Sequence, residues 1–166
     1  MERLLDIGAG RVHAVVGSLT VPRPWDLRQL LDTVATSRGR PIILLARTGL
    51  ACANHPCGIW IERDNDDIIV YDDQTSNYHV EQIVLHELGH ILLDHGAGGT
   101  SGKPETQIEL MVPDIDPATV RRVLGRSIYD DERESEAELF ASLVLSKAKK
   151  GLSATRFYST FFRDAD

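Results

Sequence analysis

Residues 80–93, VEQIVLHELGHILL, are the strongest structural signal in the sequence. Wound as a helix, it carries apolar side chains on nearly all sides: Val80, Ile83, Val84, Leu85, Leu88, Ile91, Leu92 and Leu93. A helix that is apolar all round is buried in the protein rather than lying on its surface. Two histidines and a glutamate inside such a helix would be costly to bury without partners. The sequence therefore predicts a buried helix over 76–94, closed by Gly96, with its polar residues in a site.

The polar residues of this helix follow the spacing His86-Glu87-x-x-His90. Residues four apart project from one helix face, so His86 and His90 can offer two imidazole nitrogens to one zinc ion. Glu87 lies about 100° further around the helix, where it can reach a water molecule at the metal rather than the metal itself. Gly89 leaves room for another segment to approach. The prediction is a zinc site with Glu87 as the catalytic residue; a partly exposed helix with surface His and Glu is the alternative.

A hydrolytic zinc also needs a third protein ligand and an open position for water. The best source is a helix expected over 131–148, whose inward face combines two carboxylates with two small residues: Glu134, Ala137, Glu138 and Ala141. We expect Glu134 to bind the metal and Glu138, one turn on, to accept a hydrogen bond from a ligand histidine. Glu136 falls on a different face and is the alternative third ligand. An acidic helix start, favoured by the helix dipole, would explain part of this acidic run.

These two motifs resemble those of the ImmA/IrrE metallopeptidases, which are of the gluzincin type. The resemblance rests on HELGHILLDH at 86–95 and ExEAExFAxxVL at 134–145, and it covers roughly residues 25–146. It implies that His86, His90 and Glu134 bind zinc and that Glu87 is the catalytic base. It also implies a protein substrate, a transcriptional repressor or an antitoxin, whose cleavage releases stress-response or mobile-element genes. The family usually has Asn or Asp where this chain has Glu138.

The remaining segments predict an α+β fold. Helices are expected over 2–18 and 26–37, the second one starting at Asp26. Short runs rich in β-branched residues predict strands at 42–45, 58–62 and 67–71, the last two forming a hairpin. A glycine-rich loop over 96–104 and helices over 117–124, 131–148 and 152–162 complete the chain. The expectation is a single domain, 1–166, in which a small antiparallel sheet packs against the buried HExxH helix, with further helices at both ends.

Charge and composition narrow the classes of function. The 25 acidic and 18 basic side chains give a formal net charge of −7, which argues against direct nucleic-acid binding, since phosphate contacts need a basic surface. No apolar run approaches the roughly 18 residues that span a bilayer, and the first residues do not have the pattern of a secretory signal. Two cysteines, Cys52 and Cys57, are too few for a disulfide framework. We expect a cytoplasmic protein with reduced thiols.

Four other features are weaker candidates. His95 is expected at a helix end or on the surface, and His79, two helical turns before His86, is too far away to bind the same metal. The segment Cys52-x4-Cys57 does not have enough ligands for a metal site. Tyr129 is a candidate donor to an oxyanion, because such a site needs a hydrogen-bond donor near the catalytic residues.

The leading hypothesis for function is a zinc metalloendopeptidase that hydrolyses peptide bonds in a regulatory protein. Zinc would polarise the scissile carbonyl, and Glu87 would move the proton from water to the leaving amine. The alternative is a non-catalytic zinc-containing module that docks to a transcriptional regulator. A purely structural zinc fits less well, because such sites usually have four protein ligands.

Overall fold

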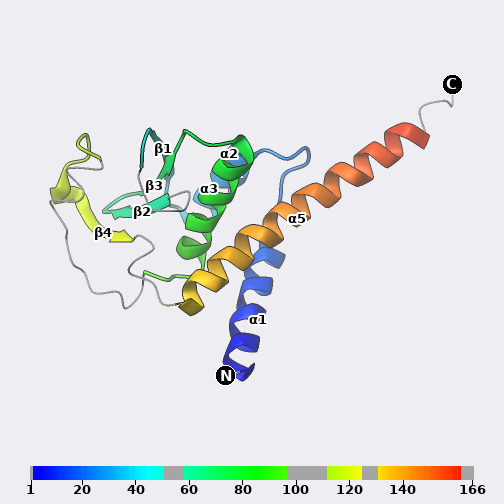
Figure 1. Cartoon of the computed structure of the whole chain (residues 1–166), viewed down its shortest axis with the longest axis horizontal. Coiled ribbons are helices and arrows are strands. Elements are labelled where there is room, and N and C mark those ends of the chain that lie inside the picture. Colours follow the sequence, from blue (N-terminus) through cyan, green and yellow to red (C-terminus); the bar gives the residue numbers. More distant parts are fainter. Residues whose placement is uncertain (1, 51–57, 97–111, 125–130, 162–166) are drawn as a thin grey trace.

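The computed structural model describes residues 2–50, 58–96, 112–124 and 131–161, with the backbone alone described at 2–7, 117, 124 and 151–161. Figure 1 shows the elements in chain order. They are α1 (Glu2–Ser18), α2 (Leu27–Arg38), β1 (Ile42–Arg47), β2 (Gly58–Arg63), β3 (Asp67–Asp72), α3 (Asn77–Leu92), a 3-10 turn (Pro117–Thr119), β4 (Val120–Leu124) and α5 (Asp131–Phe161). The predicted α+β class is confirmed.

The sheet has four strands in the order β1-β3-β2-β4. Strands β2 and β3 form the predicted antiparallel hairpin, with Trp60 opposite Ile69, and β4 pairs antiparallel with the other edge of β2. Strand β1 runs parallel to β3, with Ile43 opposite Ile68. The sheet is therefore mixed, and the expectation of an antiparallel sheet holds for two of its three pairings.

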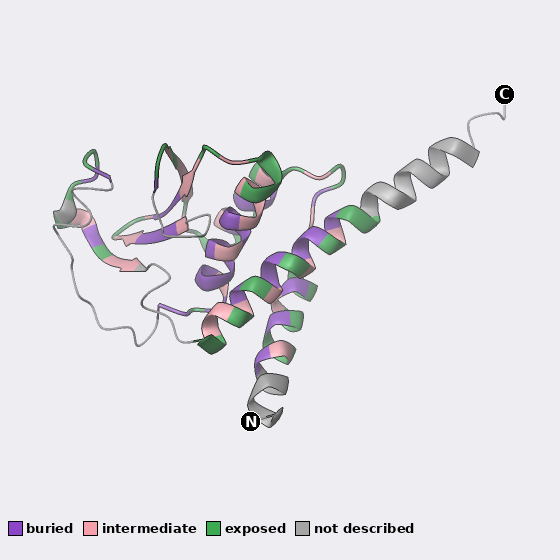
Figure 2. Cartoon of the chain, viewed as in Figure 1, coloured by how far each residue is buried: buried purple, intermediate pink, exposed green. Residues whose placement is uncertain are grey.

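Helix α3 is the centre of the molecule. It contacts β2 and β3 on one side and α5 on the other, while α1 packs against α5; Figure 1 shows this layering. In Figure 2, the later turns of α3 carry the buried residues, whereas its first turn is exposed. The buried residues of α3 are Ile83, Val84, Leu85, Glu87, Leu88, Gly89, His90 and Ile91. The prediction of a buried HExxH helix is confirmed, and burying its apolar side chains contributes roughly 1.5–3 kcal/mol each.

Two predicted helices are corrected by the structure. In 117–124, the Asp116-Pro117 start signal produces one 3-10 turn, in which the Asp116 side chain accepts a hydrogen bond from the Ala118 N–H at 2.9 Å. Residues Val120–Leu124 then form β4, because pairing with β2 and the β-branched side chains outweigh local helix preference. The helices expected over 131–148 and 152–162 are one continuous helix, α5.

Gly151 lies inside α5 and does not end it. A glycine ends a helix when it adopts a left-handed backbone, and among the described residues only Gly39 and Gly49 are glycines with positive φ. A helical glycine costs about 1 kcal/mol relative to alanine, which the rest of a long helix can absorb. Although α5 spans 31 residues, no helix in the described part of the chain is both long and apolar enough to cross a membrane.

A buried ion-pair cluster around Asp67 ties the sheet to α2. Asp67 is 0% exposed, and its Oδ2 accepts hydrogen bonds from Arg38 Nη1 at 2.8 Å and Arg40 Nε at 3.0 Å. Its Oδ1 accepts from the Trp60 indole N–H at 2.9 Å. Asp67 thus fixes the start of β3 against β2 and the end of α2. Since β2 and β3 lie against α3, the cluster also holds the platform on which the polar residues of α3 are placed.

Candidate metal centre

Helix α3 starts and ends with well-defined caps. The Ser76 hydroxyl accepts the His79 N–H at 3.3 Å at the N-terminus. At the C-terminus, the Asp94 N–H donates to the Ile91 carbonyl at 3.3 Å and the His95 N–H donates to the His90 carbonyl at 3.0 Å. These two bonds form a Schellman motif, whose left-handed residue is Asp94, with φ 52°. The helix therefore turns at Asp94 and not at the predicted Gly96, and this turn directs His95 back beneath His90.

Close packing of α3 on α5 brings the third carboxylate to the histidines. A Cβ placed on Gly89 would lie 3.2 Å from the Ala137 Cα and 3.2 Å from Phe140 Cδ1. The two backbones are in contact at this point, as the glycine and the alanine predicted. Glu134 lies one turn before Ala137 on the same helix face, so it projects toward the histidine pair.

The three predicted ligands meet around one point. The His86 and His90 Nε2 atoms are 3.0 Å apart. Glu134 Oε2 lies 3.4 Å from His86 Nε2, and Glu134 Oε1 lies 3.5 Å from His90 Nε2. Two ligand atoms bound at 2.0–2.1 Å to a tetrahedral zinc are roughly 3.3 Å apart. Within the described residues, His86, His90 and Glu134 are a group that could hold a metal ion.

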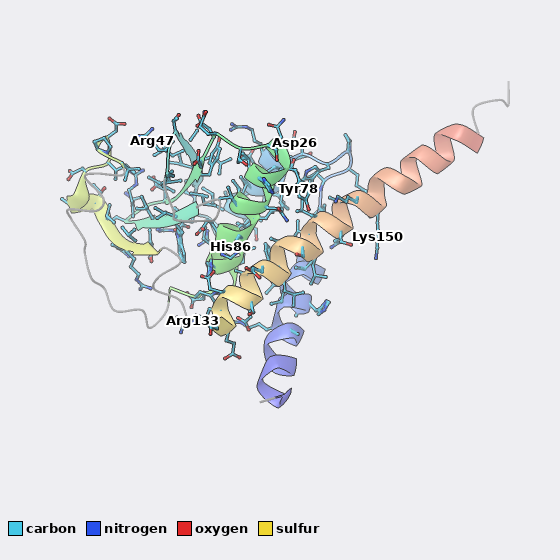
Figure 3. All side chains as sticks on the ribbon, in the orientation of Figure 1. Asp26, Arg47, Tyr78, His86, Arg133 and Lys150 are labelled. Atoms are coloured by element: carbon cyan, nitrogen blue, oxygen red, sulfur yellow. The ribbon has the colours of Figure 1, made fainter. Side chains whose placement is uncertain are left out.

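The three side chains of the group are buried to different degrees. The side chain of His90 is 1% exposed, whereas those of His86 and Glu134 are 17% and 16% exposed. Figure 3 shows the His86 end of α3 beside the first turn of α5, where Arg133 is labelled. One side of the group is therefore enclosed and the other reaches solvent, which is the arrangement that a site with an open coordination position requires.

The protonation states suit a cation. Burial lowers the pKa of His90 to about 4, with the neighbouring His86 adding to the effect and Glu134 opposing it. Burial opposes ionisation of Glu134, but the interactions with His86 and His90 outweigh it and lower the pKa of this carboxyl. Near pH 7, His90 is therefore neutral and Glu134 is a carboxylate. Metal ligands bind in these forms, so no proton has to be displaced from either residue.

Glu87 lies beneath the first residue of β2. It is 5% exposed, and a Cβ placed on Gly58 would lie 2.6 Å from its Oε1 and 2.7 Å from its Cγ. Gly58 thus leaves the space that the Glu87 side chain fills. The sequence analysis assigned Glu87 its role but did not identify Gly58, whose importance depends on where the hairpin crosses α3.

Behind His90 lies a chain of polar groups that the sequence analysis did not predict. His90 Nδ1 is 2.9 Å from His95 Nδ1, and His95 Nε2 is 2.8 Å from Glu136 Oε2. His95 is 2% exposed, and burial lowers its pKa against the opposing effect of Glu136. Of the two expectations for His95, the position at a helix end is therefore correct and the position on the surface is wrong. Glu136 is also not the third ligand of the group, since its carboxylate faces His95.

The predicted supporting role of Glu138 is not what the structure displays. Glu138 is exposed, and the carboxylate that follows the ligand histidines is Glu136. The buried stripe of α5 runs through Ala137, Phe140, Ala141 and Val144. Glu136 precedes Phe140 by four residues and so lies along this stripe. That spacing was the available signal; Glu138, one turn from Glu134, is exposed.

The other candidates from the sequence are His79, Cys52, Cys57 and Tyr129. His79 is exposed at the start of α3, with its Nδ1 3.2 Å from the Thr75 hydroxyl, in agreement with the expectation that it does not join the ligands. Cys52, Cys57 and Tyr129 lie outside the described residues.

Comparison of the chain with protein-family models, with curated proteins and with solved structures finds no match.

Proposed function

We propose that this protein is a zinc-dependent endopeptidase, with His86, His90 and Glu134 as the metal ligands and Glu87 as the general base. The observation that carries the proposal is that the three ligand atoms, two from α3 and one from α5, all lie within 4.8 Å of one another, while α3 also carries the buried Glu87. Two histidines and a glutamate form a donor set of catalytic zinc sites, which leave one position open.

The donor set favours zinc over harder cations. Two imidazole nitrogens suit zinc and other transition metals, whereas calcium and magnesium prefer oxygen ligands. A zinc ion held there would act as a Lewis acid toward a peptide carbonyl and lower the pKa of water toward about 7. His90 holds its ligand atom from the enclosed side, while His86 and Glu134 border the side where substrate can enter.

The position of Glu87 supports a role in proton transfer. Glu87 is next to a ligand in sequence but projects from a different side of α3, where it meets Gly58 instead of joining the ligand group. A carboxylate in this position would accept a proton from the attacking water and deliver it to the leaving amine. Its 5% exposure restricts the solvent that would compete for that proton.

For the substrate, we propose a transcriptional repressor or an antitoxin. This choice follows from the resemblance of HELGHILLDH and ExEAExFAxxVL to the ImmA/IrrE motifs. The formal charge of −7 is consistent with action on a protein partner and with no direct contact to nucleic acid.

The metal site is tested by zinc stoichiometry and affinity. Purified wild type is expected to contain one zinc per chain, and His86→Ala and His90→Ala are expected to lose it. Glu134→Gln should weaken zinc binding strongly, because a neutral amide is a poorer ligand than a carboxylate. Glu138→Gln is the matched control, on the exposed side of the same helix, and should bind like wild type. Equal affinities for these two variants would contradict the assignment of Glu134.

Catalysis is tested with Glu87→Gln, which keeps shape and hydrogen bonding but cannot take the proton. The zinc-loaded variant and wild type are incubated with a peptide library made from cellular proteins, and new N-termini are identified by mass spectrometry. Wild type should generate new termini and the variant about 100- to 10,000-fold fewer. The same pair is then co-expressed with a regulator encoded nearby. Equal relief of repression by both would support docking without cleavage and would overturn the peptidase proposal.

A further inference from the structure

We propose that His95 and Glu136 are positioning residues for the metal centre, which hold His90 in the tautomer whose Nε2 lone pair faces the metal. The inference rests on the proposed zinc site and deepens it. It concerns a three-member chain in which Glu136 contacts His95 and His95 contacts His90, at 2.8 Å and 2.9 Å. Neither His95 nor Glu136 belongs to the ligand group itself.

The hydrogen-bonding capacity of each group determines which nitrogen of His95 and of His90 carries the proton. An ionised carboxylate can only accept hydrogen bonds, so Glu136 requires a proton on His95 Nε2. A neutral His95 then has a lone pair on Nδ1, which must accept the proton carried by His90 Nδ1. His90 is left with a lone pair on Nε2, the atom that lies 3.5 Å from Glu134 Oε1 in the ligand group. The opposite order would place the His95 lone pair against the carboxylate and a proton on the metal-facing nitrogen of His90.

The backbone around His95 is held from three other elements. The Leu93 carbonyl accepts a hydrogen bond from Arg11 of α1, and the His95 carbonyl accepts one from Arg133 of α5 at 3.0 Å. The Gly96 carbonyl accepts one from Arg122 of β4 at 2.5 Å. Cations at the end of a helix also interact favourably with its dipole. The turn that places His95 under His90 is therefore fixed by contacts across the whole molecule.

Helix α1 leaves space for Glu136, the last member of the series of contacts that starts at His90. A Cβ placed on Gly8 would lie 2.5 Å from Glu136 Oε1, whereas a Cβ on Gly10 would meet nothing within 4 Å. Gly8 is buried against the carboxylate, and Gly10 is exposed on the same helix. The absence of a side chain at position 8 thus allows Glu136 to sit where it can accept from His95.

The first test exchanges His95 for two side chains of nearly the same shape. Asparagine places its carbonyl oxygen where His95 has Nδ1 and can still accept from His90, while leucine cannot. His95→Leu is expected to weaken zinc binding about 10- to 100-fold, the usual cost of losing a partner behind a metal ligand. His95→Asn is expected to recover most of that loss. A packing role alone would favour leucine in this buried place, so the order of the two affinities, measured by competition with a chromogenic chelator, separates the two explanations.

The second test displaces the Glu136 carboxylate by a substitution on α1. Gly8→Ala should displace Glu136 and weaken zinc binding by up to about 10-fold, although alanine stabilises the helix by about 1 kcal/mol relative to glycine. Gly10→Ala brings the same gain in helix propensity without touching Glu136 and should bind zinc like wild type. Thermal unfolding of both variants verifies that each is folded. Equal zinc affinity of the two variants would show that the position of Glu136 does not affect the metal ligands.

The third measurement reads the tautomer directly in metal-free wild type. A long-range proton–nitrogen NMR correlation should show the proton of His90 on Nδ1, and Glu136→Gln should shift part of the population to Nε2, since an amide can donate as well as accept. A proton on Nε2 in wild type would overturn the inference. So would wild-type zinc affinity in His95→Leu and Gly8→Ala, with the proposed metal site left intact. Failure of wild type to bind zinc would instead remove the metal site, and the inference with it.

Discussion

Asp67→Asn is expected to destabilise the fold although it changes a single atom. The Asn oxygen can still accept from Trp60, but its amide group would face the Arg38 and Arg40 guanidinium groups with donors against donors. Two hydrogen bonds between charged groups are lost, each worth about 1.5–3 kcal/mol. The two arginine side chains are 27% and 22% exposed, so they recover part of their hydration. We expect a net loss of about 2–3 kcal/mol in the free energy of unfolding.

Urea unfolding in the presence of a chelator measures this loss without a contribution from bound metal. The control is Asp64→Asn, which removes a second aspartate–arginine pair. Asp64 contacts Arg121 at 2.5 Å, but both side chains are 58% exposed. Water replaces such a partner readily, so no measurable change is expected. Similar urea midpoints for the two variants would refute the argument that burial gives Asp67 its importance.

Three further outcomes are expected. Gly58→Ala should push Glu87 by about 1 Å, which costs about 100-fold in peptide cleavage, while zinc affinity, measured by chelator competition, should stay at the wild-type value. Gly89→Leu should force α3 and α5 apart and lower the free energy of unfolding, measured with urea, by about 1–3 kcal/mol or more. Because Glu134 would move away from the histidines, zinc binding should also be lost. Retained zinc binding would contradict the packing argument. The pKa of His90, lowered to about 4, should make the metal-free protein lose stability as the pH falls from about 6.5 to 4, because the unfolded chain takes up a proton that the folded one refuses. Urea unfolding at several pH values checks this. Relative to its value at pH 7, the free energy of unfolding of wild type should fall by about 3 kcal/mol more than that of His90→Gln when the pH reaches 4.

Local patterns predicted the elements that depend on their own residues. Asp26 caps α2 by accepting the Gln29 N–H at 3.0 Å, as its position in the sequence predicted. The apolar residues around His86 and His90 predicted a buried helix. By contrast, Val120–Leu124 forms a strand only because β2 offers it an edge. The residues 117–124 carry no information about that edge, so the helix start signal at Asp116-Pro117 led to the prediction of a helix.

The same distinction applies to the site. His86, Glu87 and His90 lie on one helix, so their spacing alone fixed their relative directions. Glu134 could be chosen over Glu136 only by assuming a particular face of contact, and the small residues Gly89 and Ala137 were the right guide to it. That contact follows from sterics at one crossing point and needs no knowledge of the rest of the chain.

The positions of His95 and Glu136 depend on more than one contact between helices, so the sequence alone did not predict them. His95 lies beneath His90 because Asp94 adopts a left-handed backbone, which a non-glycine residue rarely does, and because arginines from α1, β4 and α5 hold the turn. Glu136 faces His95 because α5 also packs on α1, where Gly8 leaves room for the carboxylate. Read along the sequence, one of these residues looks like the end of a helix and the other like part of an acidic surface. Their chemistry belongs to the meeting of three helices, and a substitution at Gly8, far along the chain from any ligand, is therefore the sharpest probe of the metal site.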